Sequence, residues 1–352
     1  MQDSRARQTR QIGAVNGAGV RLHVPRDAHI QPYPLNFRPI LRRQIWGGSY
    51  LAPLYNVPDD QAIGEAWTLS SHPAALSVCQ NGPLAGLTLA QITERYPLAY
   101  LGQPSPGQFP LLIKLIDAAE NLSVQVHPAD SLAWELEGQA GKTESWYILQ
   151  SGPGEIIWGH CFRSPEDVWR AQREQNWSRW IQRRRVQAGD LVHIPAGQVH
   201  ALLGGTRVIE IQQASDVTYR LYDWDRRGQD GLPRPLHLEK ASQAINYQAA
   251  TTGPSPAPQL LQQRPGLIQR QLLACPFYSI QEACLQGELQ LMADRPQIVI
   301  VCQGWGELHS PQGVDWLDQR ANTWLLPALP DAYYSLRAEP DLHVLIVDWE
   351  VG

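Results

Sequence analysis

The sequence predicts an all-β fold of two β-barrels with helical insertions, and three observations lead to this prediction. From position 110 onward the apolar residues come in short runs separated by turn residues, a pattern typical of sandwiches and barrels. A second segment, 266–352, repeats this rhythm. Residues 251–265 lie between the two and are rich in proline and small polar residues, which is the composition of a linker.

We therefore expect a disordered tail at 1–30, a first barrel domain at 31–250, a linker at 251–265 and a second barrel domain at 266–352. The runs that predict strands are 111–116, 123–126, 146–149, 191–194, 208–211, 297–301, 304–307, 324–327 and 343–347. A helical insertion is predicted around 165–185, because Ser164 can cap a helix, Pro165 suits its first turn and apolar residues recur at helical spacing.

Size and composition exclude several classes of protein. With 352 residues, 43% of them apolar, the chain can bury one large core or two modest ones. A net charge of -5 offers no electrostatic footprint for nucleic acid. No apolar run approaches the roughly 18 residues that cross a bilayer, and we expect a cytoplasmic protein without membrane contact. The five scattered cysteines are expected to be reduced thiols in the core.

A motif at 189–200 predicts a metal ligand at the mouth of the first barrel. It consists of Gly189, five further residues, Pro195, one residue, Gly197, two more residues and His200. Turns at the two glycines would bracket a strand and bring His200 into the barrel. This spacing resembles the second motif of the cupins. His193, on the same strand, is expected to be structural.

Three further ligand candidates precede this motif. Gln125 and His127 share one face of a strand because its side chains alternate with a period of two, and a carboxylate follows at Glu144. An amide oxygen, two imidazoles and a carboxylate suit a borderline divalent ion such as zinc and leave one position for water or substrate. We expect one zinc ion per chain, bound by the first barrel. The second barrel has a motif-like turn at 326–328 without a following histidine, so we expect no metal there.

Four segments resemble the type I mannose-6-phosphate isomerases in their short bacterial form. These segments are FPLLIKLIDA at 109–118, LSVQVHP at 122–128, GKTESWY at 141–147 and SDVTYRLYDWDR at 215–226. The likeness spans about residues 34–350 and is most specific within 110–226. It implies a zinc enzyme that interconverts mannose 6-phosphate and fructose 6-phosphate, with a small sugar phosphate as its partner. The sequence leaves open whether such an enzyme is a monomer or a homodimer.

The resemblance also implies roles for individual residues. The implied metal ligands are Gln125, His127, Glu144 and His200. The implied catalytic residues are Arg220, Lys142 and Glu65, and the residues implied to hold the phosphate are Lys114, Ser123 and Arg226.

An aldose–ketose isomerase opens the sugar ring and moves a proton between neighbouring carbons through an enediol. Arg220 would stabilise the charge that develops, and either Lys142 or Glu65 could transfer the proton. The sequence does not choose between these two. Arg220 could instead pair with one of the nearby aspartates, Lys114 could extend its ammonium to water at a barrel end, and Arg226 could be a solvated surface residue.

Three other functions remain open at this stage. The first is an isomerase or epimerase of another sugar phosphate. The second is a non-catalytic cupin that binds a sugar phosphate and regulates a partner, although no helix-turn-helix pattern or basic face is present. The third is an iron-dependent oxidative cupin. Such sites usually begin with a His-x-His pair, and Gln125 in the first position disfavours this reading.

Overall fold

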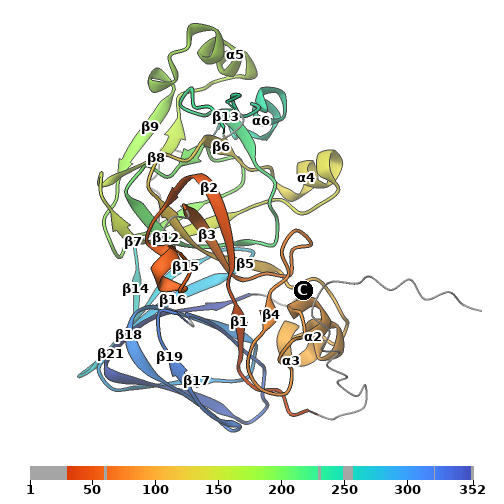
Figure 1. Ribbon diagram of the computed structural model, residues 1–352, viewed down its shortest axis with the longest axis vertical. Helices are drawn as coiled ribbons and strands as arrows, with labels where there is room; N and C mark the ends of the chain where they lie inside the picture. The colour runs from red at the N-terminus through yellow and green to blue at the C-terminus, as the bar shows by residue number, and fades with distance from the viewer. Residues whose placement is uncertain (1–29, 59–61, 229–230, 249–256, 321, 350–352) are drawn as a thin grey trace, which may run out of the picture. The chain divides into compact units, whose positions relative to one another are not determined.

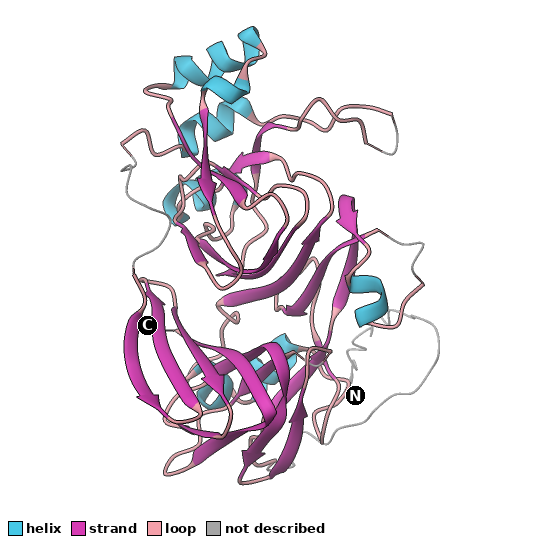
Figure 2. Cartoon of the chain, turned by 90° about the vertical axis from the view of Figure 1, so that its left-hand side faces the viewer, coloured by secondary structure: helices cyan, strands magenta, loops and turns pink. Residues whose placement is uncertain are grey.

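The computed structural model describes residues 30–352 apart from 59–61, 229–230, 249–256, 321 and 350–352. The predicted tail at 1–30 therefore lies almost entirely outside the described residues. Strands are the predominant secondary structure of the described chain, and the helices are few and short (Figure 2). The predicted all-β fold with helical insertions is confirmed, whereas its division into two barrels stays a prediction.

The strands, in chain order, are β1 (Leu35–Arg38), β2 (Ile40–Gly48), β3 (Ile63–Leu69), β4 (Val78–Cys79), β5 (Leu111–Ala118), β6 (Val124–Val126), β7 (Glu144–Ser151), β8 (Glu155–His160), β9 (Ile181–Arg185), β10 (Leu191–Ile194), β11 (His200–Ala201), β12 (Thr206–Gln213), β13 (Tyr219–Tyr222), β14 (Gln259–Arg264), β15 (Leu267–Ala274), β16 (Ser279–Leu285), β17 (Glu288–Met292), β18 (Gln297–Ser310), β19 (Gly313–Leu317), β20 (Thr323–Leu326) and β21 (Tyr333–Asp348). The helices are α1 (Leu51–Leu54), α2 (Leu89–Arg95), α3 (Pro97–Leu101), α4 (Asp130–Glu137), α5 (Pro165–Glu174) and α6 (Leu238–Ala244), with a 3-10 turn at Trp177–Arg179. None of these described helices has the length and apolar character required to span a membrane.

The described strands form three sheets (Figure 1). A six-stranded sheet runs β10-β7-β12-β5-β2-β3, and a five-stranded sheet runs β13-β6-β11-β8-β9. A ten-stranded sheet holds β14 to β21 together with β1 and β4. Two N-terminal strands thus belong to the C-terminal sheet, because β1 pairs with β20 as well as with β4. The predicted boundary between the two domains is therefore crossed by backbone pairing.

The predicted helical insertion needs a correction in its second half. Helix α5 occupies Pro165–Glu174, but Ile181–Arg185 forms β9 and pairs with β8. Trp177 and Trp180, which follow α5, are buried in the apolar cluster on one side of the five-stranded sheet. Their apolar spacing reflects this packing and not a continuing helix, because buried aromatic side chains do not require helical backbone.

The predicted linker at 251–265 is wrong for its second half. Gln259–Arg264 forms β14, an edge strand whose residues are all exposed and which pairs with β15. Exposure explains the polar composition that suggested a linker, since an edge strand can present both faces to water. Residues 251–256 lie outside the described part of the chain. The expectation that all cysteines are core thiols also needs correction: the five are free, but only Cys79 and Cys302 are buried.

Strand β12 brings the polar residues of the six-stranded sheet together. It pairs with β5 on one side and β7 on the other, so that Glu210 lies opposite Lys114 and also opposite Trp146. Two residues further along β12, Gln212 lies opposite Glu144. Directly opposed residues in an antiparallel pair point to the same face of the sheet, so this register sets up the contacts described next.

Candidate metal centre

The predicted metal ligands lie on two of the sheets. Gln125 is in β6 and His127 follows directly after that strand, while His200 opens β11 and lies opposite Gln125. Glu144 opens β7 in the six-stranded sheet. The side chains of His127, Glu144 and His200 converge, with candidate ligand atoms all within 4.8 Å of one another.

Glycine turns account for the position of His200. Gly189 and Gly197 have φ angles of 92° and 87°, in the left-handed region that favours glycine. Strand β10 runs between them, as the motif predicts. The amide of Gly197 donates to the carbonyl of His127 at 2.8 Å, and this bond ties the second motif to the first.

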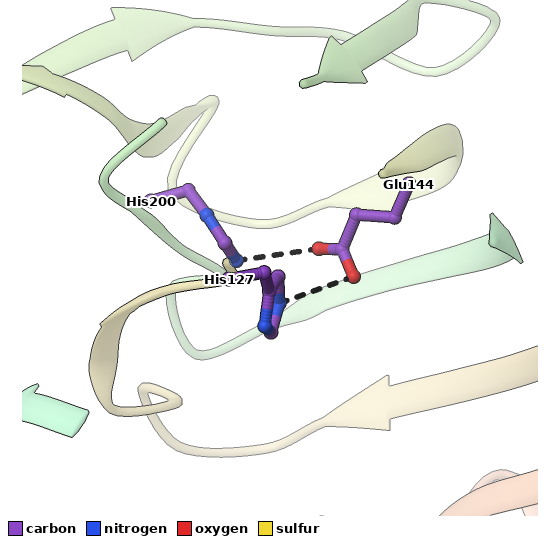
Figure 3. Close-up of side chains that lie close together, drawn as sticks. All are labelled: His127, Glu144 and His200. Carbon is purple, nitrogen blue, oxygen red and sulfur yellow. Dashed lines mark ion pairs between the residues drawn. The ribbon is translucent and has the colours of Figure 1, made fainter. Parts of the chain in front are cut away.

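The carboxylate of Glu144 faces both imidazoles, with one oxygen directed at each (Figure 3). Oε2 is 3.3 Å from Nε2 of His127, and Oε1 is 3.3 Å from Nε2 of His200. The imidazole rings themselves are 4.8 Å apart, centroid to centroid. All three side chains are at most 1% exposed, so this is a fully buried group of polar atoms.

Backbone carbonyls orient both histidines. Nδ1 of His127 lies 2.7 Å from the carbonyl of Val217, and Nδ1 of His200 lies 2.8 Å from the carbonyl of Gln198. A carbonyl can only accept, so Nδ1 is the donor in each ring and Nε2 of a neutral ring keeps its lone pair. Fixing one ring nitrogen in this way is the usual means of presenting the other to a metal.

The local electrostatics favour a neutral His127 beside an ionised Glu144 carboxylate. Burial, assisted by the charge of Lys142, lowers the pKa of His127 to about 3. Burial alone would raise the pKa of Glu144, but Lys142 and His127 hold it well below its usual range. These are the protonation states in which imidazole and carboxylate bind metals.

The residues present fit a zinc-like ion. Oε1 of Glu144 is buried and has no hydrogen-bond partner among the described residues, which is costly for a carboxylate oxygen unless a further group binds it. The amide nitrogen of Gln125 lies 3.4 Å from Nε2 of His200, and its Oε1 accepts from the hydroxyl of Ser123 at 3.1 Å. Rotating the amide by half a turn would present Oε1 to the cluster, and Ser123 could then accept from the amide nitrogen.

Lys142 reaches the same group of atoms. Its ammonium contacts the Glu144 carboxylate and lies 3.2 Å from Nε2 of His127. It is also 4.0 Å from Glu210, whose carboxylate forms a 2.9 Å ion pair with Lys114. Negative and positive side chains therefore alternate along a chain of contacts that starts at the cluster, in the order Glu144, Lys142, Glu210, Lys114.

Glu65 lies at the far end of this chain of charges. Its carboxylate accepts from Nε1 of Trp67 at 2.7 Å and from the amide of Gln44 at 3.1 Å. The ammonium of Lys114 lies 5.0 Å from the centre of the Trp67 ring. Burial alone would lower the pKa of Lys114, but the carboxylates of Glu210 and Glu65 raise it above its ordinary value. Glu65 thus helps to keep Lys114 charged, whereas Lys142 contacts His127 and Glu144 directly.

Arg220 shares a face with two of the predicted ligands. It lies opposite Gln125 in the pairing of β13 with β6, just as His200 lies opposite Gln125 in the pairing of β11 with β6. The three side chains therefore form a row across the five-stranded sheet. One guanidinium nitrogen of Arg220 donates to the carbonyl of Pro235 at 2.9 Å. Burial, followed by the nearby Arg234, lowers its pKa.

Asp223 pairs with other arginines. Its carboxylate accepts from Arg226 at 2.6 Å and from Arg234 at 2.5 and 2.7 Å. A second nitrogen of Arg226 has only a 3.7 Å contact with Glu120, which is 63% exposed. Of the three residues predicted to hold phosphate, Ser123 thus lies beside Gln125, Lys114 is buried against Glu210, and Arg226 belongs to this arginine–aspartate cluster.

Comparisons with known proteins identify the family of this chain. A family model described as the catalytic domain of type I phosphomannose isomerase matches residues 35–156. Mannose-6-phosphate isomerase ManA of Bacillus subtilis is 37% identical over 285 residues, which cover 80% of this chain and 89% of that protein. The chain therefore belongs to the type I mannose-6-phosphate isomerase family.

Solved structures of members of this family share the fold. The crystal structure of the mannose 6-phosphate isomerase from Bacillus subtilis superposes with a TM-score of 0.81 at 31% identity, covering 90% of this chain and 99% of that one. A mannose 6-phosphate isomerase described as bound with zinc and yttrium has a TM-score of 0.67 at 15% identity, covering 91% and 100% of the two chains. At that identity the likeness shows the fold alone.

Two residues near the site, Glu210 and Arg234, were not predicted from the sequence. Glu210 interrupts the apolar run 208–211, and a single acid within such a run was a signal that a buried cation lies nearby. Arg234 lies 11 residues from Asp223 in a proline-containing segment, and no local spacing marks its partner. His193, by contrast, lies outside the cluster as expected, with Nδ1 3.1 Å from the hydroxyl of Ser145.

We predict that His127→Ala and His200→Ala each lose one equivalent of bound metal per chain. Zinc needs three or four protein ligands held together, so the loss of one imidazole should weaken the site severely. Metal analysis after dialysis measures this, with circular dichroism to verify folding. His193→Ala is the matched control and should keep its metal. Unchanged metal content in both ligand variants would contradict the assignment.

Proposed function

We propose that this protein is a zinc-dependent mannose-6-phosphate isomerase that interconverts mannose 6-phosphate and fructose 6-phosphate through an enediol. The observation that carries the proposal is the buried group of His127, Glu144 and His200 with Lys142 beside it, in a chain that belongs to this family. Arg220 lies in the same cross-strand row as Gln125. Gln125 is proposed as the fourth ligand. The bound zinc would act as a Lewis acid that polarises the substrate oxygens next to the reacting carbons.

Arg220 is proposed to stabilise the negative charge that develops on the enediol oxygens. It remains a cation throughout the reaction, and it lies in the same cross-strand row as Gln125 and His200. The alternative of an ion pair with Asp223 has less support, because that carboxylate already accepts from Arg226 and Arg234.

Lys142 is the better placed of the two candidates for proton transfer. Its Nζ lies beside the Glu144 carboxylate and 3.2 Å from His127, where it could exchange a proton with a carbon of the bound sugar. The carboxylate of Glu65 is instead held by Trp67 and Gln44, on the other side of Lys114. We therefore assign proton transfer to Lys142 and propose that Glu65 maintains the charge of Lys114.

Arg226 is the strongest of the three candidates for holding the phosphate. One side of its guanidinium is anchored by Asp223, and the other side has only the 3.7 Å contact with exposed Glu120, which a phosphate could replace. Lys114 has less support, because the carboxylate of Glu210 already binds its ammonium and offsets its charge. Ser123 lies two residues from Gln125 and would contribute its hydroxyl.

We predict that the purified protein forms fructose 6-phosphate from mannose 6-phosphate and that a chelator abolishes this activity. A coupled assay for fructose 6-phosphate measures it, and restoring zinc should restore the rate because the metal is the Lewis acid. A chelator-insensitive rate would contradict zinc dependence. Absence of turnover in the zinc-loaded protein would contradict the proposed substrate.

We predict that Arg220→Ala lowers kcat about 100- to 1,000-fold, the typical effect of removing one group that stabilises transition-state charge. Zinc content and the circular dichroism spectrum should stay at wild-type values, because Arg220 neither binds the metal nor carries a buried ion pair in the described structure. Exposed Arg227, in the neighbouring loop, provides the control Arg227→Ala. Near-normal turnover in Arg220→Ala would exclude the catalytic assignment.

We predict that Arg226→Met raises the KM for mannose 6-phosphate about tenfold or more, since hydrogen bonds to charged groups contribute roughly 1.5–3 kcal/mol. It should also lower kcat, because phosphate binding helps to position the sugar. Any residual activity on unphosphorylated mannose should change little, and Arg227→Met should behave as wild type. Lys114 is tested as Lys114→Met combined with Glu210→Gln, which leaves no unpaired carboxylate. Equal loss on both sugars would refute a phosphate site here.

A further inference from the structure

A second group of potential metal ligands lies on the ten-stranded sheet, away from the centre described above. Glu282 and Cys284 belong to β16 and His343 to β21, and their ligand atoms all lie within 4.8 Å of one another. None of the three belongs to the site proposed for the isomerase, and the sequence motifs predict no metal site in this half of the chain.

Strand register accounts for this grouping. Cys284 lies directly opposite His343 in the pairing of β16 with β21, and Glu282 lies two residues from Cys284 on the same face. The alternate residues Ala283 and Leu285 face the apolar core of the sheet. The three ligand side chains therefore share the opposite face of the sheet, with orientations set by the paired backbone.

The carboxylate of Glu282 is held from two directions. Its Oε2 accepts from Arg270 at 2.8 Å, while its Oε1 lies 3.0 Å from Nε2 of His343 and accepts from the hydroxyl of Tyr147 at 2.7 Å. The Tyr147 hydroxyl is also 3.2 Å from Nε2 of His343. One carboxylate oxygen is thus fixed by Arg270, and the other lies among the groups that would surround an ion.

The group is also accessible. Cys284 and His343 are half-buried and line a cavity of about 720 Å³. His343 also lines a neighbouring cavity of about 480 Å³ together with Tyr147. An ion could therefore enter, and there is room for water as a further ligand.

We propose that Glu282, Cys284 and His343 bind a divalent ion of the zinc type, with water or Tyr147 completing the coordination. A thiolate, an imidazole and a carboxylate are the donors such an ion prefers. Binding converts the Cys284 thiol to a thiolate and the His343 side chain to the neutral imidazole, and the protons released pass to water. Because Tyr147 belongs to β7, the ion would fasten the six-stranded sheet to the ten-stranded one, and its presence would raise the metal content above the one zinc per chain expected from the sequence.

Cobalt(II) distinguishes the two sites, because only the second contains sulfur. Titrating the metal-free protein with cobalt should produce a thiolate-to-cobalt charge-transfer absorption in the near ultraviolet. Cys284→Ser and His343→Gln should each lose this absorption and one equivalent of metal. Half-buried Cys275 provides the matched control, and Cys275→Ser should keep both. The variant His200→Ala should keep the absorption while losing the ion of the first site, so failure of either site is seen separately.

Three results would overturn the proposal. The first is no such absorption in the folded wild-type protein at saturating cobalt, which would leave Glu282 and His343 as an ordinary ion pair. The second is an absorption that persists in Cys284→Ser. The third is an absorption lost in Cys302→Ser but kept in Cys284→Ser, which would show that Cys302 and not Cys284 supplies the thiolate. If Cys284→Ser does not fold, His343→Gln gives the same test without altering the thiol.

Discussion

The rest of the site depends on one buried interaction, in which the Glu144 carboxylate contacts the imidazoles of His127 and His200 and the ammonium of Lys142. Leaving one member of a buried ion pair alone costs roughly 3–5 kcal/mol, so each charge here needs a partner. The pairing of β12 with β5 and β7 supplies the partners: it places Glu210 between Lys142 and Lys114. This alternation of charge gives a role to Lys114 and Lys142, two of only three lysines in the chain.

The neutral state of His127 makes this arrangement suitable for a cation. Burial is the main cause of the low pKa of His127, and the charge of Lys142, whose Nζ lies 3.2 Å from Nε2 of His127, lowers this pKa further. The carbonyls of Val217 and Gln198 then decide which nitrogen of each ring faces Glu144. The backbone carbonyls thus set the direction of the Nε2 atoms of the two histidines, and neighbouring side chains influence the charge of His127.

Local spacing predicted much of this from the sequence. The strand period placed Gln125 and His127 together, and the glycine-bracketed strand before His200 lies where its motif indicates. Glu210 escaped prediction because its partners, Lys114 and Lys142, are 96 and 68 residues away, and only strand register brings them together. The strand at Gln259–Arg264 was missed for a different reason: an exposed edge strand has the polar composition of a linker.

The second ligand group illustrates the same limit more sharply. A search for the glycine–proline–histidine motif in the C-terminal half finds nothing, yet Cys284 and His343 lie opposite each other across 59 residues of sequence. A Glu-x-Cys pair on a strand does not by itself indicate a metal site. Only the pairing of β16 with β21, which brings His343 to Cys284, reveals the group. The contact of Tyr147 with both Glu282 and His343 adds a constraint that neither half of the chain contains alone. Because Tyr147 lies three residues after Glu144 on β7, whatever holds it also helps to fix the strand that carries the buried carboxylate of the first site.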